Sequence, residues 1–287
     1  MTQRVYPVIM NLHPIGRYGL KETETLATMI LLEIVFLAIV QGVTEFLPVS
    51  SSGHLVVLAA LFEQFGINIQ ERLTVNIVLH VGTLLAIVVF YWRRILALLG
   101  QDRRVIGLII VGSVPAAVVG LFLKSYFTET LEHPLTAGLM FPITAAMLLW
   151  TTRHKSGELS CRDLSYSHAL FIGLFQAFAI LPGISRSGSS IVAGLGVGLK
   201  RNEAATFSFL LAIPVLSGAG LLEGIAIAGG ANGSVPIFVL IVGALVSFVV
   251  GLASLFWLIK WLEKGRLYWF AWWLLILAPI VLVWQLI

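Results

Sequence analysis

The stretch Leu181-Pro-Gly-Ile-Ser-Arg-Ser-Gly-Ser-Ser190 interrupts a long apolar part of the sequence, and the predicted topology depends on it. The apolar arms on either side, residues 168–181 and 188–199, are each shorter than the roughly 20 residues that a membrane-spanning helix needs. A second break, Leu47-Pro-Val-Ser-Ser-Ser-Gly-His54, divides residues 28–65, although its first arm is long enough to span by itself. Irregular backbone at membrane depth is tolerated only where protein or water surrounds it. Each break therefore predicts a re-entrant helix–loop–helix hairpin.

The composition places the chain in a membrane. Of its 287 residues 59% are apolar and 11% charged, with a mean hydropathy of +0.98, whereas soluble domains have about 45–50% apolar and 25% charged residues. Soluble and disordered classes are therefore excluded, and continuous apolar runs disfavour an outer-membrane barrel. A single cysteine, Cys161, excludes a disulfide framework. We expect no nucleic-acid partner, because the basic residues form short clusters between apolar runs.

Charge counting predicts the topology. Twelve of the 18 basic residues lie in four links, which are expected to be cytoplasmic, while the alternate links are poor in them. The predicted spans that these links connect are residues 74–92, 105–123, 135–150, 207–228, 236–259 and 267–287. Span 135–150 ends inside and span 207–228 begins inside, so the intervening hairpin enters and leaves on the cytoplasmic side. The first hairpin enters from the outside by the same reasoning.

Each half of the chain thus contains one hairpin followed by three spans, and the second half is inverted relative to the first. An offset of 135 residues aligns Gln41 with Gln176, Ser50 with Ser185 and Gly53 with Gly188. The predicted fold is an all-α polytopic membrane protein, with six transmembrane helices and two re-entrant hairpins in two inverted-topology repeats. In one integral-membrane domain, repeat 1 covers 29–150 (hairpin 29–65) and repeat 2 covers 165–287 (hairpin 168–199). Residues 1–28 are polar and are expected to be a poorly ordered extension.

Ionisable groups at membrane depth suggest function, and three of them, Glu45, His54 and Arg186, lie in or beside the breaks. Gln41 and Glu45 share a helix face. The Glu45 carboxylate could hold a hard cation, act as a base, or form a structural ion pair with Arg186. His80, in contrast, is expected to be a packing residue, and Trp273 to belong to an interfacial aromatic belt.

The first break offers the hydroxyls of Ser50, Ser51 and Ser52 together with Gly53, at the start of a helix whose free N–H groups attract anions. His54 lies three residues after Ser51, so Ser51 could be an activated nucleophile. The alternative is a helix-capping serine beside a histidine that only packs.

In the second break one arginine, Arg186, lies among glycines and serines, and arginine binds phosphate bidentately. The candidate substrate-binding residues of this break are Ser185, Arg186, Ser187, Gly188 and Ser190. Cation, hydroxyls, imidazole and carboxylate together favour phosphoryl transfer. In a chain that is nearly all membrane, the substrate is expected to be a lipid phosphate.

These motifs resemble a known family. Gln41 to His54 resembles the first signature of the bacterial undecaprenyl-diphosphate phosphatases of the bacitracin-resistance type, and Leu181 to Ser190 resembles the second, Pro-Gly-x-Ser-Arg-Ser-x-x-Thr. Residues 207–214, Phe-Ser-Phe-Leu-Leu-Ala-Ile-Pro, are also similar. The resemblance runs from about residue 29 to the C-terminus, and the first 28 residues have no counterpart.

The resemblance implies hydrolysis of undecaprenyl diphosphate to the monophosphate and phosphate, which recycles the lipid carrier of cell-wall synthesis. It implies Mg²⁺ or Ca²⁺ as cofactor, and a plasma-membrane site that opens to the periplasmic side. Glu45, His54, Ser51 and Arg186 match the family's essential positions, and Ser190 keeps the hydroxyl of the usual threonine. Gln41 occupies a position that is acidic or Gln in the family, so a metal site with two carboxylates is in doubt; Glu45 and Gln41 are the candidate ligands.

Two other classes of protein share part of these features. Inverted repeats are typical of transporters, so a polyprenyl-phosphate flippase is the alternative. The other superfamily of lipid phosphatases needs a distal His and Asp after its Ser-Arg pair, and neither occurs between Arg186 and residue 200. The expected partners are a polyprenyl diphosphate lipid and the membrane, with a homodimer left open.

Overall fold

The computed structural model describes residues 20–65, 72–153, 156–228 and 235–287. The described residues form helices with no β-strand, apart from an isolated bridge between Leu159 and Leu199. The helices are α1 (Leu20–Phe46), α2 (Ser51–Gln64), α3 (Arg72–Phe90), α4 (Trp92–Leu99), α5 (Arg103–Tyr126), α6 (Thr128–Leu131), α7 (Pro134–Trp150), α8 (Tyr166–Phe178), α9 (Arg186–Gly196), α10 (Arg201–Ala228), α11 (Ile237–Glu263) and α12 (Tyr268–Leu286). The predicted all-α class is confirmed.

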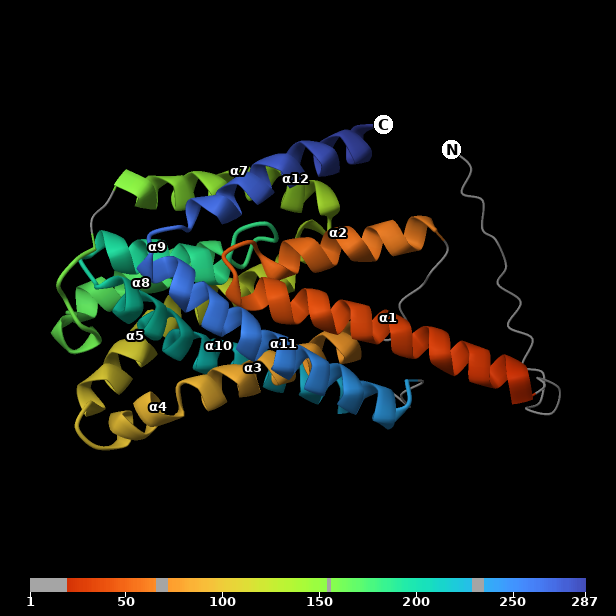
Figure 1. Ribbon diagram of the computed structural model, residues 1–287, viewed down its shortest axis with the longest axis horizontal. Coiled ribbons are helices and arrows are strands. Elements are labelled where there is room, and N and C mark those ends of the chain that lie inside the picture. The colour runs from red at the N-terminus through yellow and green to blue at the C-terminus, as the bar shows by residue number, and fades with distance from the viewer. Residues whose placement is uncertain (1–19, 66–71, 154–155, 229–234) are drawn as a thin grey trace.

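Both predicted hairpins are present. The first consists of α1 and α2, the second of α8 and α9, and the two enter the bundle from opposite ends (Figure 1). With 13 and 11 residues, α8 and α9 are too short to span a membrane. The first hairpin is less regular, because α1 has 27 residues and is long enough to cross. Helix α1 begins at Leu20, so residues 20–28 of the expected extension are helical, while residues 1–19 lie outside the described part.

By length and composition, α1, α5, α7, α10, α11 and α12 can each cross a membrane, and the pair α3–α4 is a seventh candidate. Helices α5, α7, α10, α11 and α12 match predicted spans. Helix α1 contains the first arm of residues 28–65, which is long enough to span a membrane by itself. The predicted span 74–92 corresponds to α3, but the chain bends by 70° between α3 and α4 at Tyr91, near the end of that span. The bend directs α4, which carries Arg93 and Arg94, away from the axis of α3.

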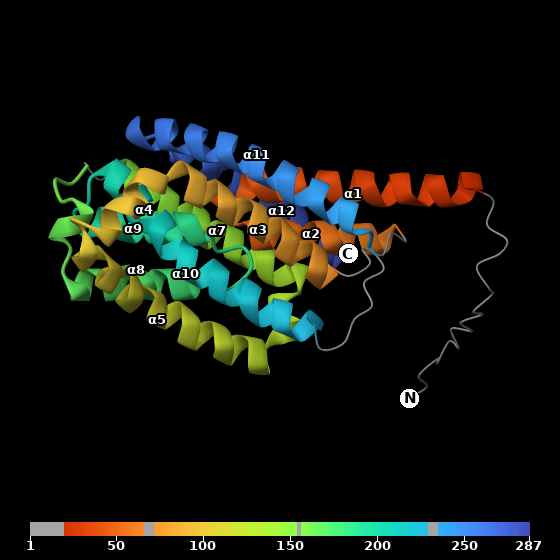
Figure 2. The same ribbon diagram turned by 90° about the horizontal axis from the view of Figure 1, so that it is seen from below.

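The helix contacts follow the two-fold pattern that inverted repeats require. Helix α1 packs on α11 just as α8 packs on α5, α3 packs on its counterpart α10, and α7 on α12. In Figure 2 α1 and α11 lie along one edge of the bundle and α5 along the opposite edge. Small residues allow these close approaches: a Cβ on Gly173 of α8 would lie 2.2 Å from the carbonyl oxygen of Gly112 on α5.

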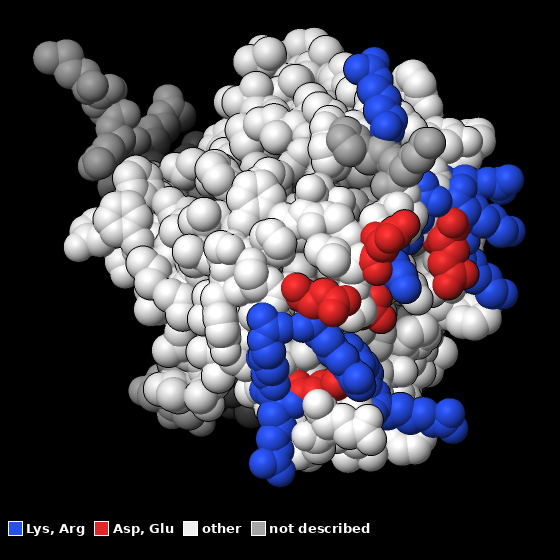
Figure 3. Space-filling model, turned by 90° about the vertical axis from the view of Figure 1, so that its left-hand side faces the viewer, with Lys and Arg blue, Asp and Glu red and all other residues white. Residues whose placement is uncertain are grey.

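The basic links gather at one end of the bundle, where lysines and arginines surround a few acidic residues (Figure 3). Asp102 is buried there between Arg94 and Arg162. Arg104 donates to the carbonyl oxygens of Arg162 and Leu164, which fastens the link between the repeats to the start of α5. The second hairpin enters from this basic end and the first from the other, as charge counting predicted.

Candidate active site

A serine caps each of the short helices that follow the two breaks. Ser50 accepts a hydrogen bond from Gly53 N–H at the start of α2 (3.2 Å), and Ser185 accepts one from Gly188 N–H at the start of α9 (3.1 Å). Ser50 has a φ of +70°, the only positive value among the described residues other than glycine. Such a backbone conformation costs about 1–3 kcal/mol and persists only where its surroundings hold it. The first break is therefore held under local strain.

The two hairpin tips meet directly. Ser50 Oγ also accepts a hydrogen bond from Gly183 N–H of the second tip (3.0 Å), and Ser187 Oγ donates to Leu47 O of the first (3.4 Å). Thr144 of α7 fixes the second tip, because its hydroxyl donates to Gly183 O (2.8 Å) and accepts from Ser185 N–H (3.1 Å). The meeting of the two breaks, predicted from repeat symmetry, is thus built from specific hydrogen bonds.

Glu45, at the end of α1, lies at the centre of this meeting point and is only 6% exposed. Its Oε1 accepts from Arg186 Nη2 (2.6 Å), and its Oε2 accepts from Ser51 Oγ (2.7 Å) and from Gln41 Nε2 (3.1 Å). Four candidate residues from two hairpins therefore form one cluster. The structural ion pair with Arg186, considered as an alternative, is present.

Arg186 has donor capacity beyond this ion pair. Its guanidinium lies over the ring of Phe209, 5.8 Å from the centroid, and its buried Nη1 has no hydrogen-bond partner among the described residues. A buried polar group without a partner is costly and calls for an explanation. An anionic oxygen beside Nη1 would satisfy it, as expected of an arginine that binds phosphate.

The His54 ring does not contact the Ser51 hydroxyl, although the spacing of the two residues suggested that His54 could activate Ser51. Its Nδ1–H donates to Ser50 O (2.8 Å), and its Nε2 accepts from Trp273 Nε1–H of α12 (3.0 Å), with the two rings stacked at 6.2 Å. Both nitrogens are thereby engaged, and the hydroxyl of Ser51 donates to Glu45 instead. Trp273, expected in an interfacial belt, anchors the first hairpin to α12.

The remaining candidates of the second tip are interior residues. Ser185, Ser187 and Ser190 are each 1% exposed, and Gly188 is buried beneath Pro48. Ser190 Oγ donates to Arg186 O (2.7 Å) and lies 2.6 Å from Ser208 Oγ of α10. These serines shape and fasten the tip. The catalytic and substrate-binding candidates that are not buried are Ser51, Ser52, His54 and Arg186.

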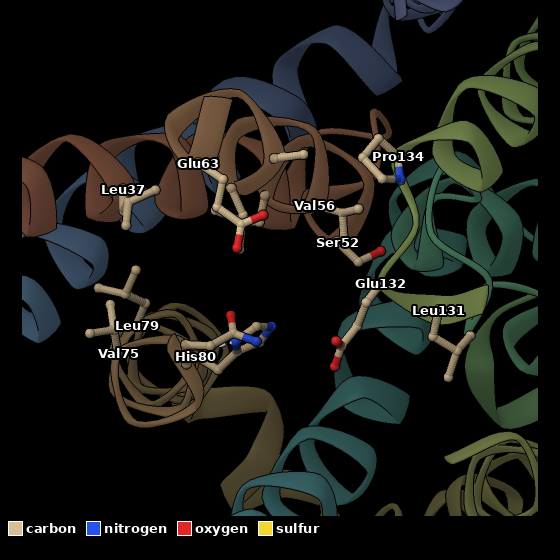
Figure 4. Close-up of a pocket in the computed structure, with 14 residues that line it drawn as sticks. Leu37, Ser52, Val56, Glu63, Val75, Leu79, His80, Leu131, Glu132 and Pro134 are labelled. Carbon is tan, nitrogen blue, oxygen red and sulfur yellow. Dashed lines mark hydrogen bonds between the residues drawn. The ribbon is translucent and has the colours of Figure 1, made fainter. Parts of the chain in front are cut away.

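A cavity of about 570 Å³ lies beside this cluster, between α2, α3 and the segment that precedes α7. Its walls are partly apolar, and Leu37 of α1 and Leu55 and Val56 of α2 line it. Figure 4 shows the ring of His80 and the carboxylates of Glu63 and Glu132 facing the same open space. An apolar wall beside a polar cluster suits a lipid with a charged head group.

His80, which was predicted to be a packing residue, lies beside the cluster and was not among the predicted site residues. It lies on α3 with its Nε2 3.8 Å from Glu45 Oε2, and it lines the cavity. The signal was available, because an ionisable side chain inside a predicted span suggests function by default. Asn76, four residues earlier and on the same helix face, also lines the cavity.

The residues present fit a divalent cation to a limited extent. The Oε1 of Gln41 is buried beside Glu45 and has no hydrogen-bond partner among the described residues. No group of three or more His, Cys, Asp or Glu side chains that could hold a metal converges in the described part of the chain. Mg²⁺ commonly binds through one or two protein ligands and the phosphates of a substrate. Gln41 and Glu45 therefore suit a cation whose other ligands come from a diphosphate.

Comparison with known proteins agrees with the motifs. The family model described as bacitracin resistance protein BacA matches residues 34–280. A protein named undecaprenyl-diphosphatase from Rhodopirellula baltica is 49% identical over 85% of this chain and 93% of its own length. Proteins of the same name from Desulfatibacillum aliphaticivorans and Methanosphaera stadtmanae are 41% and 37% identical over 84% and 88% of this chain, and over 93% and 97% of their own lengths. The match to the family model spans most of the sequence and includes both breaks, and the chain therefore belongs to the bacitracin resistance protein BacA family.

Proposed function

We propose that this chain is an integral-membrane phosphatase, which hydrolyses undecaprenyl diphosphate to undecaprenyl phosphate and phosphate. The observation that carries this proposal is the contact of Arg186 from the second hairpin with Glu45, which also binds Ser51 of the first hairpin. A guanidinium, a hydroxyl and two helix N-termini converge beside a partly apolar cavity. The names of the similar proteins support the same substrate.

The diphosphate is held by the positive groups of the two tips. Arg186 binds the terminal phosphate through the donors that Glu45 leaves unused, and the N-termini of α2 and α9 stabilise its negative charge. Ser51, held by Glu45, donates or accepts a hydrogen bond at the same phosphate. Because phosphoryl transfer is catalysed mainly by positioning and charge stabilisation, this arrangement supplies what the reaction needs. The product returns to cell-wall synthesis, and the same activity confers bacitracin resistance.

Gln41 and Glu45 would hold a Mg²⁺ or Ca²⁺ ion that accompanies the diphosphate. Such an ion would neutralise charge that develops on the phosphate oxygens. Removing divalent cations with EDTA should abolish phosphate release, and adding Mg²⁺ or Ca²⁺ should restore it. Full activity in EDTA would make the cation proposal wrong and leave the phosphatase proposal intact.

We place the protein in the bacterial plasma membrane with its site open to the outer side. Support comes from the cavity, which is lined by Glu132 and Pro134 of a link poor in basic residues. Such links are expected outside the cytoplasm. A cysteine introduced as Glu132→Cys should react with a membrane-impermeant maleimide added to intact spheroplasts. Labelling that needs permeabilised cells would place the cavity on the cytoplasmic side.

The central test is phosphate release from undecaprenyl diphosphate by the purified protein in detergent, where transport is impossible. We expect release by the wild type and a loss of at least about 100-fold in Arg186→Ala and Glu45→Ala. Arg153→Ala, which removes an exposed arginine of a basic link, is the matched control and should keep wild-type activity. No release by the wild type would favour the flippase, to be measured as lipid transfer in proteoliposomes.

A further inference from the structure

His80 occupies a fixed place between the cavity and the Glu45 cluster. Its Nδ1–H donates to Asn76 O one turn earlier on α3 (2.8 Å), which leaves Nε2 as the nitrogen with a free lone pair. The side chain is 28% exposed, and its ring faces the open space of the cavity (Figure 4). The imidazole therefore has one locked nitrogen and one nitrogen that faces the site.

The backbone beneath His80 is held rigidly against α11. Ser247 Oγ of α11 donates to Leu79 O (2.9 Å), and a Cβ on Gly82 would lie only 2.4 Å from Ala244 O. Helices this close cannot slide without breaking their contacts. The position of the imidazole relative to Glu45 is thus set by the helix packing, which is a requirement for precise positioning of a reactant.

The other candidate bases and nucleophiles of the cluster, Glu45, Ser51 and His54, already have hydrogen-bond partners. Glu45 accepts three hydrogen bonds, and the hydroxyl of Ser51 donates one of them. Both nitrogens of His54 are engaged with Ser50 and Trp273. His80 Nε2 lies 3.8 Å from Glu45 Oε2, which is too far for a direct hydrogen bond. A polar separation of this size is suited to a bridging water.

We propose that His80 is a further residue of the reaction, which holds the attacking water through a hydrogen bond to Nε2. This proposal rests on the proposed phosphatase function. A water that donates one hydrogen to His80 Nε2 and the other to Glu45 Oε2 has its lone pairs directed away from both, toward a phosphate held by Arg186. Its oxygen forms the new bond to the terminal phosphorus. The bond from that phosphorus to the bridging oxygen breaks, and the electron pair leaves with undecaprenyl phosphate. One proton of the water passes to the carboxylate of Glu45, and the other stays on the released phosphate.

Three substitutions of His80 distinguish the effect of losing the hydrogen bond at Nε2 from the effect of changing the shape of the side chain. The amide of His80→Gln reaches the position of Nε2 and can accept the same hydrogen bond, whereas the amide of His80→Asn is one carbon shorter and reaches only the position of Nδ1. His80→Leu keeps the bulk and removes the polar atoms. The test is to measure kcat and KM for phosphate release from undecaprenyl diphosphate in detergent with Mg²⁺. The thermal unfolding midpoint of each variant should be measured as well.

We expect His80→Gln to retain kcat within about threefold, and His80→Asn and His80→Leu to lose roughly tenfold to a hundredfold, which corresponds to one lost hydrogen bond in the transition state. KM should stay within about threefold, because the water is not part of the lipid's binding contacts. The proposal is overturned if His80→Leu or a folded His80→Asn keeps wild-type kcat, if folded His80→Gln is as impaired as His80→Asn, or if a phosphoryl group is trapped on Ser51. If the wild type itself releases no phosphate, the proposed function fails, and not merely the role of His80.

Discussion

A single methyl group at Gly53 should separate the two hairpin tips. A Cβ on Gly53 would lie 2.7 Å from Gly183 N, 2.7 Å from a ring carbon of Phe141 and 2.9 Å from Gly183 Cα. Carbon atoms in contact prefer a separation of about 3.5–4.0 Å, so the backbone of the second tip must withdraw by about 0.8 Å. The obstructing atoms belong mostly to the backbone, which cannot rotate away.

The withdrawal has a calculable effect on the site. The hydrogen bond from Gly183 N–H to Ser50 Oγ, now 3.0 Å, would lengthen beyond about 3.5 Å and be lost. Overpacking of this kind costs about 1–3 kcal/mol of stability. Arg186 follows Gly183 by three residues, so it would move relative to Glu45 and Ser51 by a similar distance. A misplacement near 1 Å can lower a rate by about 100-fold.

The assay compares Gly53→Ala with Gly218→Ala in purified protein. Gly218 lies on α10, and a Cβ there would meet nothing within 4 Å. We expect Gly53→Ala to lower kcat/KM for undecaprenyl diphosphate by about 100-fold, and Gly218→Ala to leave it unchanged while adding up to about 1 kcal/mol of helix stability. Wild-type activity and an unchanged unfolding midpoint in Gly53→Ala would refute the described contact between the tips.

Three further predictions follow from individual contacts. Arg186→Lys should lower kcat for phosphate release roughly tenfold to a hundredfold, because an ammonium cannot bind Glu45 and a phosphate with the fork geometry of a guanidinium. Ser50→Ala removes the acceptor of two buried N–H groups, one of them from Gly183, and should lower the free energy of unfolding by about 2 kcal/mol or more in an SDS titration. Burial and a neighbouring carboxylate raise the pKa of the Cys161 thiol, so iodoacetamide at pH 8 should label it only after denaturation, as measured by mass spectrometry.

The features that the sequence predicted correctly are local in the chain. Pro48 and Pro182 mark the breaks, and Ser50 and Ser185 cap the helices that follow. Each of these patterns lies within a few residues of the chain. The distribution of basic residues in the links predicts from which side each hairpin enters the membrane. Convergence of the tips followed from symmetry alone. The all-α fold with two hairpins could therefore be derived without knowledge of any long-range contact.

The features that were missed depend on packing between distant segments. His54 and Trp273 are separated by 219 residues, and no local pattern indicates that their rings stack. Spacing suggested a contact of His54 with Ser51, but the capping geometry of Ser50 turns the imidazole toward its own carbonyl oxygen. His80 reaches Glu45 only because α3 packs beside α1.

The divergence of the two repeats explains how the site remains stable without its substrate. The 135-residue offset places Ile180 opposite Glu45 and Arg186 opposite Ser51, so the carboxylate comes from one hairpin and the guanidinium from the other. Leaving a charge buried and uncompensated costs about 3–5 kcal/mol, and Glu45 removes that cost for Arg186 as long as no anion is bound. A diphosphate that enters with the proposed cation would bring charge for both partners, and Arg186 Nη1 is the donor without a partner that could receive it. Neither repeat alone could provide this pair, and a perfectly symmetric dimer of one repeat would place two like charges at the same point. The duplicated scaffold supplies two converging helix N-termini, and the asymmetry between its halves supplies the charge balance.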